Sequence, residues 1–172
     1  MHEFLERDLA YVIRLDEVVW GSLLLGITLF IHGLGLYQTM RLSSALLART
    51  EHTRFQGYVS MGILIVAAWI IVVTSLVEVV IWAGFFVWKD AQPNVFTAIY
   101  NAILNYTTLQ AGYLPIRWRL LEGLLGMAGL MTAAWSTGIW FNVAQPVLQG
   151  SLARERERHR LRAAGHERDR LP

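Results

Sequence analysis

Two groups of side chains in this sequence have types and spacing suited to chemistry. Thr107, Thr108 and Gln110 follow one another closely where a moderately apolar stretch, 94–109, ends, and their hydroxyl and amide groups could contact a polar ligand, whereas threonines near a helix end also serve as caps or packing. Glu78 and Glu122 lie instead within long, otherwise apolar runs. Because an ionisable residue inside a membrane span is by default a functional hypothesis, both acids are candidates for a site.

Enzyme chemistry, in contrast, has no recognisable motif. The chain has no cysteine, no metal-spaced histidine pair, no glycine-rich phosphate loop and no nucleophile with an evident base. His32 lies beside two glycines in an apolar run, and we expect it to serve helix packing or a polar contact. The other histidines lie in polar flanks, at positions 2, 52, 159 and 166. We therefore predict no enzyme, no metal site and no cofactor.

Composition indicates the environment that positions these residues. The 172 residues are 55% hydrophobic and only 16% charged, whereas a soluble domain carries about 25% charged residues. Seven tryptophans among 12% aromatic residues suit a chain that meets bilayer interfaces. We predict an all-α membrane protein with the lipid bilayer as its first partner.

The apolar runs predict three transmembrane helices and one shorter helix. At about 1.5 Å per residue, three runs are long enough to cross a hydrocarbon core of about 30 Å. These spans are expected at about 18–40, 57–88 and 118–147, within a membrane domain of 18–147. The stretch 93–109, with Pro93 in its first turn, is short for a span and predicts a re-entrant helix.

Polar segments flank the spans. Residues 1–17 predict an amphipathic helix at the membrane surface, 41–56 is a polar connection, and 148–172 is a charged tail, either a helical extension or disordered. Basic residues are unequally divided between the two sides of three spans, five against ten. The smaller set is Arg7, Arg14, Lys89, Arg117 and Arg119; the larger is Arg41, Arg49, Arg54 and seven in the tail. The positive-inside rule then places the tail in the cytoplasm and the amino terminus outside.

The segment around the short helix resembles a known family. AIYNAILNYTTL is similar to the pore helix, and WRLLEGLLGMAGLMTAAWST to the inner helix, of bacterial potassium channels with two helices per pore. VEVVIWA, Val77 to Ala83, resembles the outer helix of the same family, so the resemblance covers roughly Val77 to Phe141. It implies a re-entrant pore helix, a homotetramer around a central axis and a bacterial inner membrane.

The filter-like loop, 107–115, departs from the family pattern. The family has Thr-Thr-Leu-Gly-Tyr-Gly-Asp, and the matching residues here are Thr107, Thr108, Leu109, Gln110, Ala111, Gly112 and Tyr113. Backbone carbonyls from four chains replace the water shell of the ion in such filters, and glycine permits the backbone conformation that aims them inward. Either this carbonyl ring is distorted here, or four Gln110 side chains build a different constriction.

Several polar and small residues near this loop have two interpretations. Glu78 is either an ion-path group or, as we favour, a structural clamp that pairs with Arg117, Arg119 or a pore-helix hydroxyl. Glu122 either joins that network or bonds Arg119 along the helix. Gly126 and Gly129 provide a small face for packing between copies of the chain, which we favour over a gating hinge.

The resemblance implies passive cation conduction with altered or lost potassium selectivity, and it allows a monovalent cation in the pore. The alternative is a non-conducting structural or interaction module that keeps the channel architecture. A small secondary transporter is less favoured because the chain shows no internal inverted repeat. For the arginine-rich tail we expect contact with anionic lipid and no nucleic-acid binding, because no aromatic residues are interleaved with its charges.

Overall fold

The computed structural model describes residues 14–50, 56–109, 112 and 114–168, and this part of the chain is helical without strands. Its elements are α2 (Leu15–Thr50), α3 (Gln56–Trp88), α4 (Val95–Tyr106), a single 3₁₀ turn η1 (Ile116–Trp118) and α5 (Arg119–Arg168). Three of the helices are long and one, α4, has only 12 residues. The predicted all-α class is confirmed for these residues.

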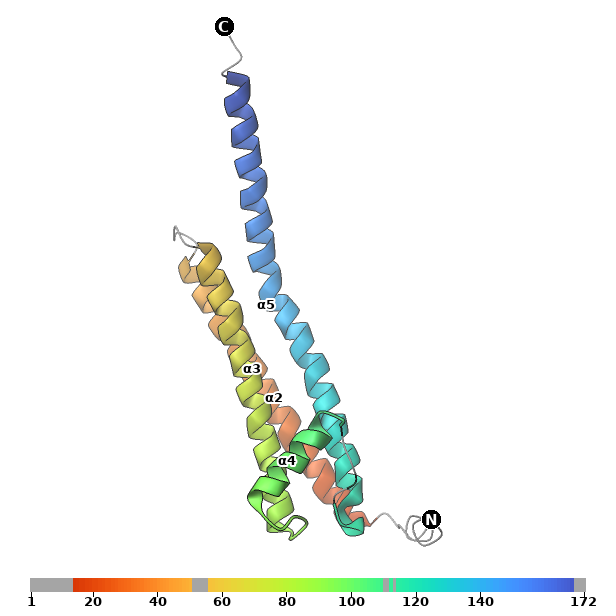
Figure 1. Ribbon diagram of the computed structural model, residues 1–172. Helices are drawn as coiled ribbons and strands as arrows, with labels where there is room; N and C mark the ends of the chain where they lie inside the picture. Colours follow the sequence, from red (N-terminus) through yellow and green to blue (C-terminus); the bar gives the residue numbers. More distant parts are fainter. Residues whose placement is uncertain (1–13, 51–55, 110–111, 113, 169–172) are drawn as a thin grey trace, which may run out of the picture.

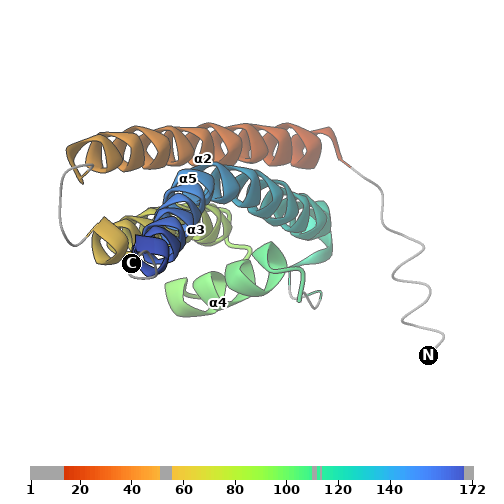
Figure 2. The same ribbon diagram turned by 90° about the horizontal axis from the view of Figure 1, so that it is seen from above.

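The long helices form a bundle that α4 enters from one end. Figure 1 shows α2 and α3 antiparallel, with α5 beside them and extending beyond the bundle. From above, α2 lies along one side, α4 lies on the opposite side, and α3 and α5 lie between them (Figure 2). The short helix therefore contacts the bundle on the side away from α2.

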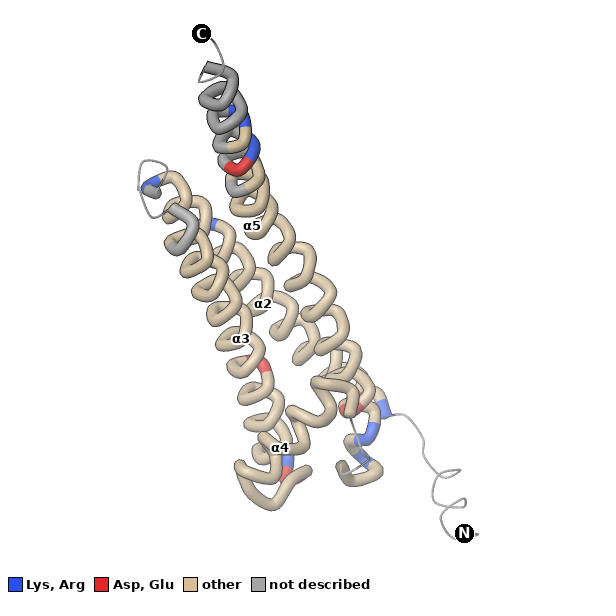
Figure 3. Tube along the Cα trace, turned by 45° about the horizontal axis from the view of Figure 1, so that its top comes forward, with Lys and Arg blue, Asp and Glu red and all other residues tan. Residues whose placement is uncertain are grey.

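The three long helices are apolar enough to cross a bilayer. The qualifying stretches are Leu15–Arg49, Val59–Trp88 and Ile116–Gly150. Large apolar side chains point outward from them; on α3, for example, Trp69, Val73 and Val80 are all more than half exposed. Figure 3 shows the charged residues mostly near the ends of the bundle, with Glu78 the one acidic residue of α3. A surface this apolar suits lipid and not water.

Two helices run further than the predicted spans. α2 continues past residue 40 to Thr50, through much of the expected polar connection. Residues 36–50 contain no glycine and no proline, so nothing in this stretch breaks the helix. α5 passes through Pro146 and continues to Arg168, so the described part of the tail is a helical extension. Polarity marks where a chain leaves the membrane, but it does not end a helix.

α4 begins and ends through local hydrogen bonds. Asn94 caps its amino end, because the Asn94 side-chain oxygen accepts a hydrogen bond from the Thr97 N–H at 2.8 Å. Pro93 therefore precedes the cap and does not lie in the first turn as predicted. The helix stops at Tyr106 and not at 109, because the N–H groups of Thr108 and Leu109 fold back onto carbonyls of the last turn.

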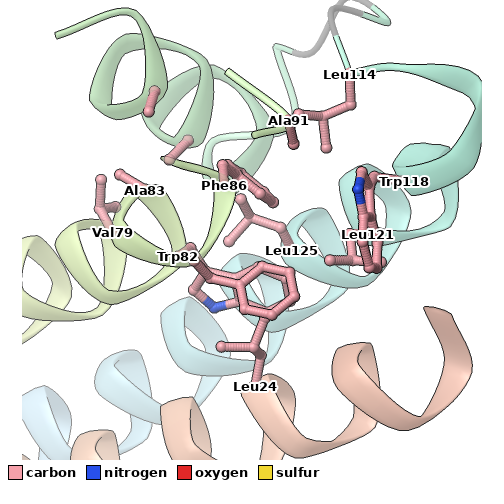
Figure 4. Close-up of a cluster of buried hydrophobic side chains, with 13 residues drawn as sticks. Leu24, Val79, Trp82, Ala83, Phe86, Ala91, Leu114, Trp118, Leu121 and Leu125 are labelled. Atoms are coloured by element: carbon pink, nitrogen blue, oxygen red, sulfur yellow. The ribbon is translucent and has the colours of Figure 1, made fainter. Parts of the chain in front are cut away.

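A compact apolar core fixes one face of α4 at this end of the bundle. Figure 4 shows Trp82 and Phe86 of α3 packed with Leu121 and Leu125 of α5, and all four are fully buried. Ala98 and Ala102 are the fully buried residues that α4 contributes to this core. Small side chains at these positions let the α4 backbone lie close to its neighbours. The core thus sets the direction in which the carboxyl end of α4 points.

Candidate ion path and its anchoring network

The carboxyl end of α4 lies directly against α5. A Cβ atom added at Gly129 would overlap the backbone carbonyl oxygen of Tyr106, and one added at Gly126 would lie 3.3 Å from the carbonyl oxygen of Asn105. Gly126 and Gly129 therefore pack within the chain, whereas the sequence favoured packing between copies. Added Cβ atoms at Gly123 and Gly138 meet nothing within 4 Å, so these two positions remain open. Close backbone approach is the reason for glycine at 126 and 129.

The filter-like residues begin at this contact. The Thr107 hydroxyl donates to the Ile103 carbonyl at 2.8 Å and so caps its own helix. Thr108 has a φ of 61° and Gly112 a φ of 68°. This left-handed conformation is natural for glycine but uncommon for a β-branched residue. Gln110, Ala111 and Tyr113 lie outside the described residues.

An open cavity of about 340 Å³ lies beside this segment. Its lining comes from α4, the turn after it and the first turns of α5: Asn105, Thr108, Arg119, Glu122, Gly123 and Gly126. Asn105 is only 2% exposed, and its side-chain N–H donates to the Asn101 carbonyl at 2.9 Å. Its amide oxygen has no hydrogen-bond partner within the described residues. The residue lines the cavity although this oxygen is itself buried, and a buried acceptor without a partner is uncommon in proteins.

The other clamp candidates hold the chain as it returns from α4 to α5. Glu122 accepts a hydrogen bond from the backbone N–H of Leu114 at 2.7 Å, in a buried position. Arg117 contacts Asp16 of α2 at 3.3 Å, at the exposed end of the bundle. Glu122 therefore fixes the returning segment, and Arg117 ties it to the start of α2.

Glu78 lies in a buried polar network on another side of the same helix end. Its Oε1 lies 2.8 Å from Nδ1 of His32 in α2, and its Oε2 accepts a hydrogen bond from the Tyr106 hydroxyl at 2.7 Å. His32 and Glu78 are each 1% exposed. Of the partners considered from sequence, a hydroxyl of the short helix contacts Glu78.

Two side chains of α5 complete this network. The Tyr106 hydroxyl lies 2.6 Å from Oγ1 of Thr132, and Nε2 of His32 lies 2.8 Å from Oγ of Ser136. Each of the four helices α2 to α5 therefore contributes at least one polar side chain. We call His32, Glu78, Tyr106, Thr132 and Ser136 the anchoring network.

The pairing of His32 with Glu78 was not predicted from the sequence. A signal was present, because the two residues lie in neighbouring antiparallel helices at similar depth. His32 precedes the end of α2 by 18 residues, and Glu78 follows the start of α3 by 22 residues. At about 1.5 Å per residue these separations correspond to about 27 Å and 33 Å. Comparing depths along adjacent spans would have brought the two together.

The fold and the site define a class: an all-helical protein with three bilayer-length helices and a short helix that ends against the third. Within the part of the chain that the structure describes, no three His, Asp or Glu residues form a group able to hold a metal ion. No protein-family model, curated protein or solved structure matches the chain.

Proposed function

We propose that the chain is a potassium-channel-like pore protein of the bacterial inner membrane that conducts cations passively with altered or lost potassium selectivity. The observation that carries this proposal is the path of α4. The helix starts near the end of α3, and its last residue lies against Thr132, which is 13 residues into α5. That separation corresponds to about 20 Å along α5. The chain then returns to begin α5 at the same end.

Backbone that turns at such a depth needs a protein-enclosed environment. Irregular backbone at membrane depth is tolerated only where protein buries it or where it lines a water-filled cavity. The turn after α4 borders the cavity, which Thr108 and Asn105 both line. This arrangement supports a hydrated path beside Thr108.

Electrostatics favour a cation in that path. The carboxyl end of a helix carries a partial negative charge, equivalent to roughly half an elementary charge. In α4 this end lies at the filter-like residues, next to the Asn105 oxygen and the Glu122 carboxylate. Arg119 also lines the cavity and partly offsets that charge.

A single chain cannot enclose an axis, so the proposal requires several copies. The face of α4 away from the core is apolar and unpartnered, with Phe96 86% and Tyr100 61% exposed. Closed rotational symmetry would cover such faces with neighbouring chains, and the resemblance implies four. We place the tail in the cytoplasm, beside anionic lipid, and the amino terminus outside, following the distribution of basic residues.

A second candidate function is a non-conducting module with the same architecture. It is favoured by the filter-like positions themselves, because Gln110, Ala111 and Tyr113 replace the family's Gly, Tyr and Asp. In this case the axis is blocked or filled with lipid, and the assembly serves structure or interaction.

Flux measurements on purified protein in liposomes separate the two candidates. Potassium, sodium and chloride fluxes would be measured separately for the native chain and for the double variant Gln110→Gly, Ala111→Tyr. We expect cation flux without chloride flux in the native protein, with selectivity changed by the double variant. Flux only in the double variant would instead support the non-conducting module. A matched control, Phe141→Leu on the exposed face of α5, leaves the loop unchanged and should leave the ion ratios unchanged.

The number of copies is tested independently of flux. Native mass spectrometry from lipid nanodiscs should give a tetramer. A monomer or dimer in both mild detergent and lipid would rule out the central pore.

A further inference from the structure

The centre of the bundle holds two titratable side chains in direct contact, away from the filter-like loop. His32 and Glu78 are joined at 2.8 Å, and each is 1% exposed. We propose that this pair is a proton-binding site that positions the carboxyl end of α4. The effect on conduction rests on the proposed function; proton binding itself does not.

The Tyr106 and Thr132 hydroxyl groups of the anchoring network each have one proton but more than one hydrogen-bond partner, so each donates to only one partner at a time. The Tyr106 hydroxyl has a single proton but lies within hydrogen-bond distance of both Glu78 Oε2, at 2.7 Å, and Thr132 Oγ1, at 2.6 Å. The Thr132 hydroxyl likewise has one proton, and it also lies 3.0 Å from the Ala128 carbonyl. The direction of this chain of bonds depends on what Glu78 offers to Tyr106.

Two directions of the chain through Glu78, Tyr106 and Thr132 are self-consistent, and one proton separates them. The Ser75 hydroxyl of α3 also hydrogen-bonds Tyr106 and can donate to the Tyr106 oxygen in either direction. When Glu78 is a carboxylate, Tyr106 donates to Glu78, and Thr132 donates to the Tyr106 oxygen. When Oε2 of Glu78 is protonated, Glu78 donates to Tyr106, Tyr106 donates to Thr132, and Thr132 donates to the Ala128 carbonyl. The proton comes from water and returns to water, and no other bond is made or broken. The network thus registers the charge state of Glu78 at the last residue of α4.

His32 can hold the same proton. With Nδ1–H donating to Glu78, the neutral ring accepts at Nε2 from the Ser136 hydroxyl, whereas the imidazolium donates there to the Ser136 oxygen. With the proton on either residue, the pair is electrically balanced, as imidazolium and carboxylate or as imidazole and carboxylic acid. Without the proton, the pair carries one net negative charge in a low-dielectric interior, which is costly.

Among the described residues, the surroundings of the pair supply no other counter-charge. From α4 the titratable group facing it is Tyr106, and from α5 the facing groups are the hydroxyls of Thr132 and Ser136 and the indole of Trp135. The rings of Trp135 and His32 are stacked with centroids 6.4 Å apart. Within the described residues, no arginine or lysine contacts Glu78. His32 is therefore the group that balances the charge of this carboxyl.

Loss of the proton acts on α4 through two effects. It leaves a negative charge next to the negative end of the helix dipole, which is a repulsive arrangement. Where Glu78 holds the proton, its loss also takes the Thr132 hydroxyl from its own helix and turns it toward Tyr106. The carboxyl end of α4, and the filter-like residues after it, are therefore held differently in the two states.

Infrared spectroscopy tests proton binding without requiring conduction. The full chain in lipid nanodiscs would be titrated from about pH 5 to about pH 9, the range in which histidine changes charge. We expect a carboxyl C=O band that titrates in the native protein, is lost in Glu78→Gln and has a changed pH profile in His32→Gln. If the native protein shows no titrating carboxyl band that Glu78→Gln lacks, the proposal is overturned.

A matched control and a second variant guard against misfolding. Thr28→Val removes the hydrogen bond from Trp82 Nε1, which also joins α2 to α3, and leaves both titratable residues in place. It should keep the titrating band. If Glu78→Gln does not fold, Tyr106→Phe serves instead, because losing one hydrogen bond should shift the Glu78 band. An unshifted band in Tyr106→Phe would contradict the reversible chain.

The flux measurement links this site to the pore. We expect cation flux to vary with pH in the native protein, and this variation to be lost in His32→Gln but kept in Thr28→Val. A titrating band with flux that ignores pH would overturn the positioning role. A titrating band with no flux at any pH would support the proton site and count against the conduction proposal. Flux without a titrating band would support the conduction proposal and count against the proton site.

Discussion

Neighbouring residues at the end of α4 lie in two very different polar environments. Tyr106 enters the anchoring network, where polar side chains from all four helices satisfy one another. Asn105 lines an open cavity of about 340 Å³, and its amide oxygen lacks a partner within the described residues. A cluster whose polar groups are all hydrogen-bonded fixes the helix in place, whereas a polar group without a partner does not. The same helix end is therefore anchored at one residue and available at the next.

The largest expected effect comes from breaking the anchored side. Glu78→Leu leaves the His32 ring and the Tyr106 hydroxyl buried without their shared acceptor. Removing one partner of a buried pair costs about 3–5 kcal/mol, so we expect a loss of that order in the free energy of unfolding. Thermal unfolding in mild detergent measures it. Glu78→Gln, which keeps an acceptor oxygen, should lose clearly less; equal losses would contradict the role given to the hydrogen bonds.

A smaller loss is expected from forcing the two helices apart. Gly129→Ala places a methyl group on the Tyr106 carbonyl oxygen, and overpacking of this kind costs about 1–3 kcal/mol. The same unfolding measurement applies. Gly138→Ala is the control, because its added methyl group meets nothing within 4 Å. If both variants unfold alike, close approach is not the reason for glycine at 129.

The turn between the two environments should tolerate, and benefit from, a glycine. Thr108 has a φ of 61°, a conformation that costs a residue with a Cβ roughly 1–2 kcal/mol. Part of that cost is offset because glycine has more freedom in the unfolded chain. We therefore expect Thr108→Gly to raise the free energy of unfolding by about 0.5–1 kcal/mol. Thr107→Gly, at the C-cap position with a φ of −86°, should lower it instead, because no positive φ is relieved and the hydroxyl bond to the Ile103 carbonyl is lost.

The smallest stability effect is expected on the open side. Asn105→Leu replaces a buried amide whose oxygen is unpartnered, so the change in unfolding free energy should stay within about 1 kcal/mol. Cation flux, in contrast, should change, because the cavity loses a polar lining residue. A large loss of stability together with unchanged flux would show that Asn105 holds the end of α4 in place and has no role in the ion path.

Local properties of the sequence determined much of the fold. Length, apolarity and low charge are properties of contiguous stretches, so three bilayer-length helices and a shorter fourth were predictable, as the described residues confirm. Helix ends were less predictable. α2 runs to Thr50 because a charged arginine is still a good helix former, and α4 stops at Tyr106 because backbone groups of the next residues fold back.

Tertiary structure alone decided the partners. His32 and Glu78 are 46 residues apart, and Glu78 and Tyr106 are 28 apart, so no local pattern pairs them. In the same way, the sequence showed that Gly129 is small but not what approaches it. Hydropathy acts on each segment by itself, whereas a hydrogen bond or a close contact depends on how helices distant in sequence are placed against one another. The sequence determined that buried polar groups must find partners, and the packing of the four helices decided which ones.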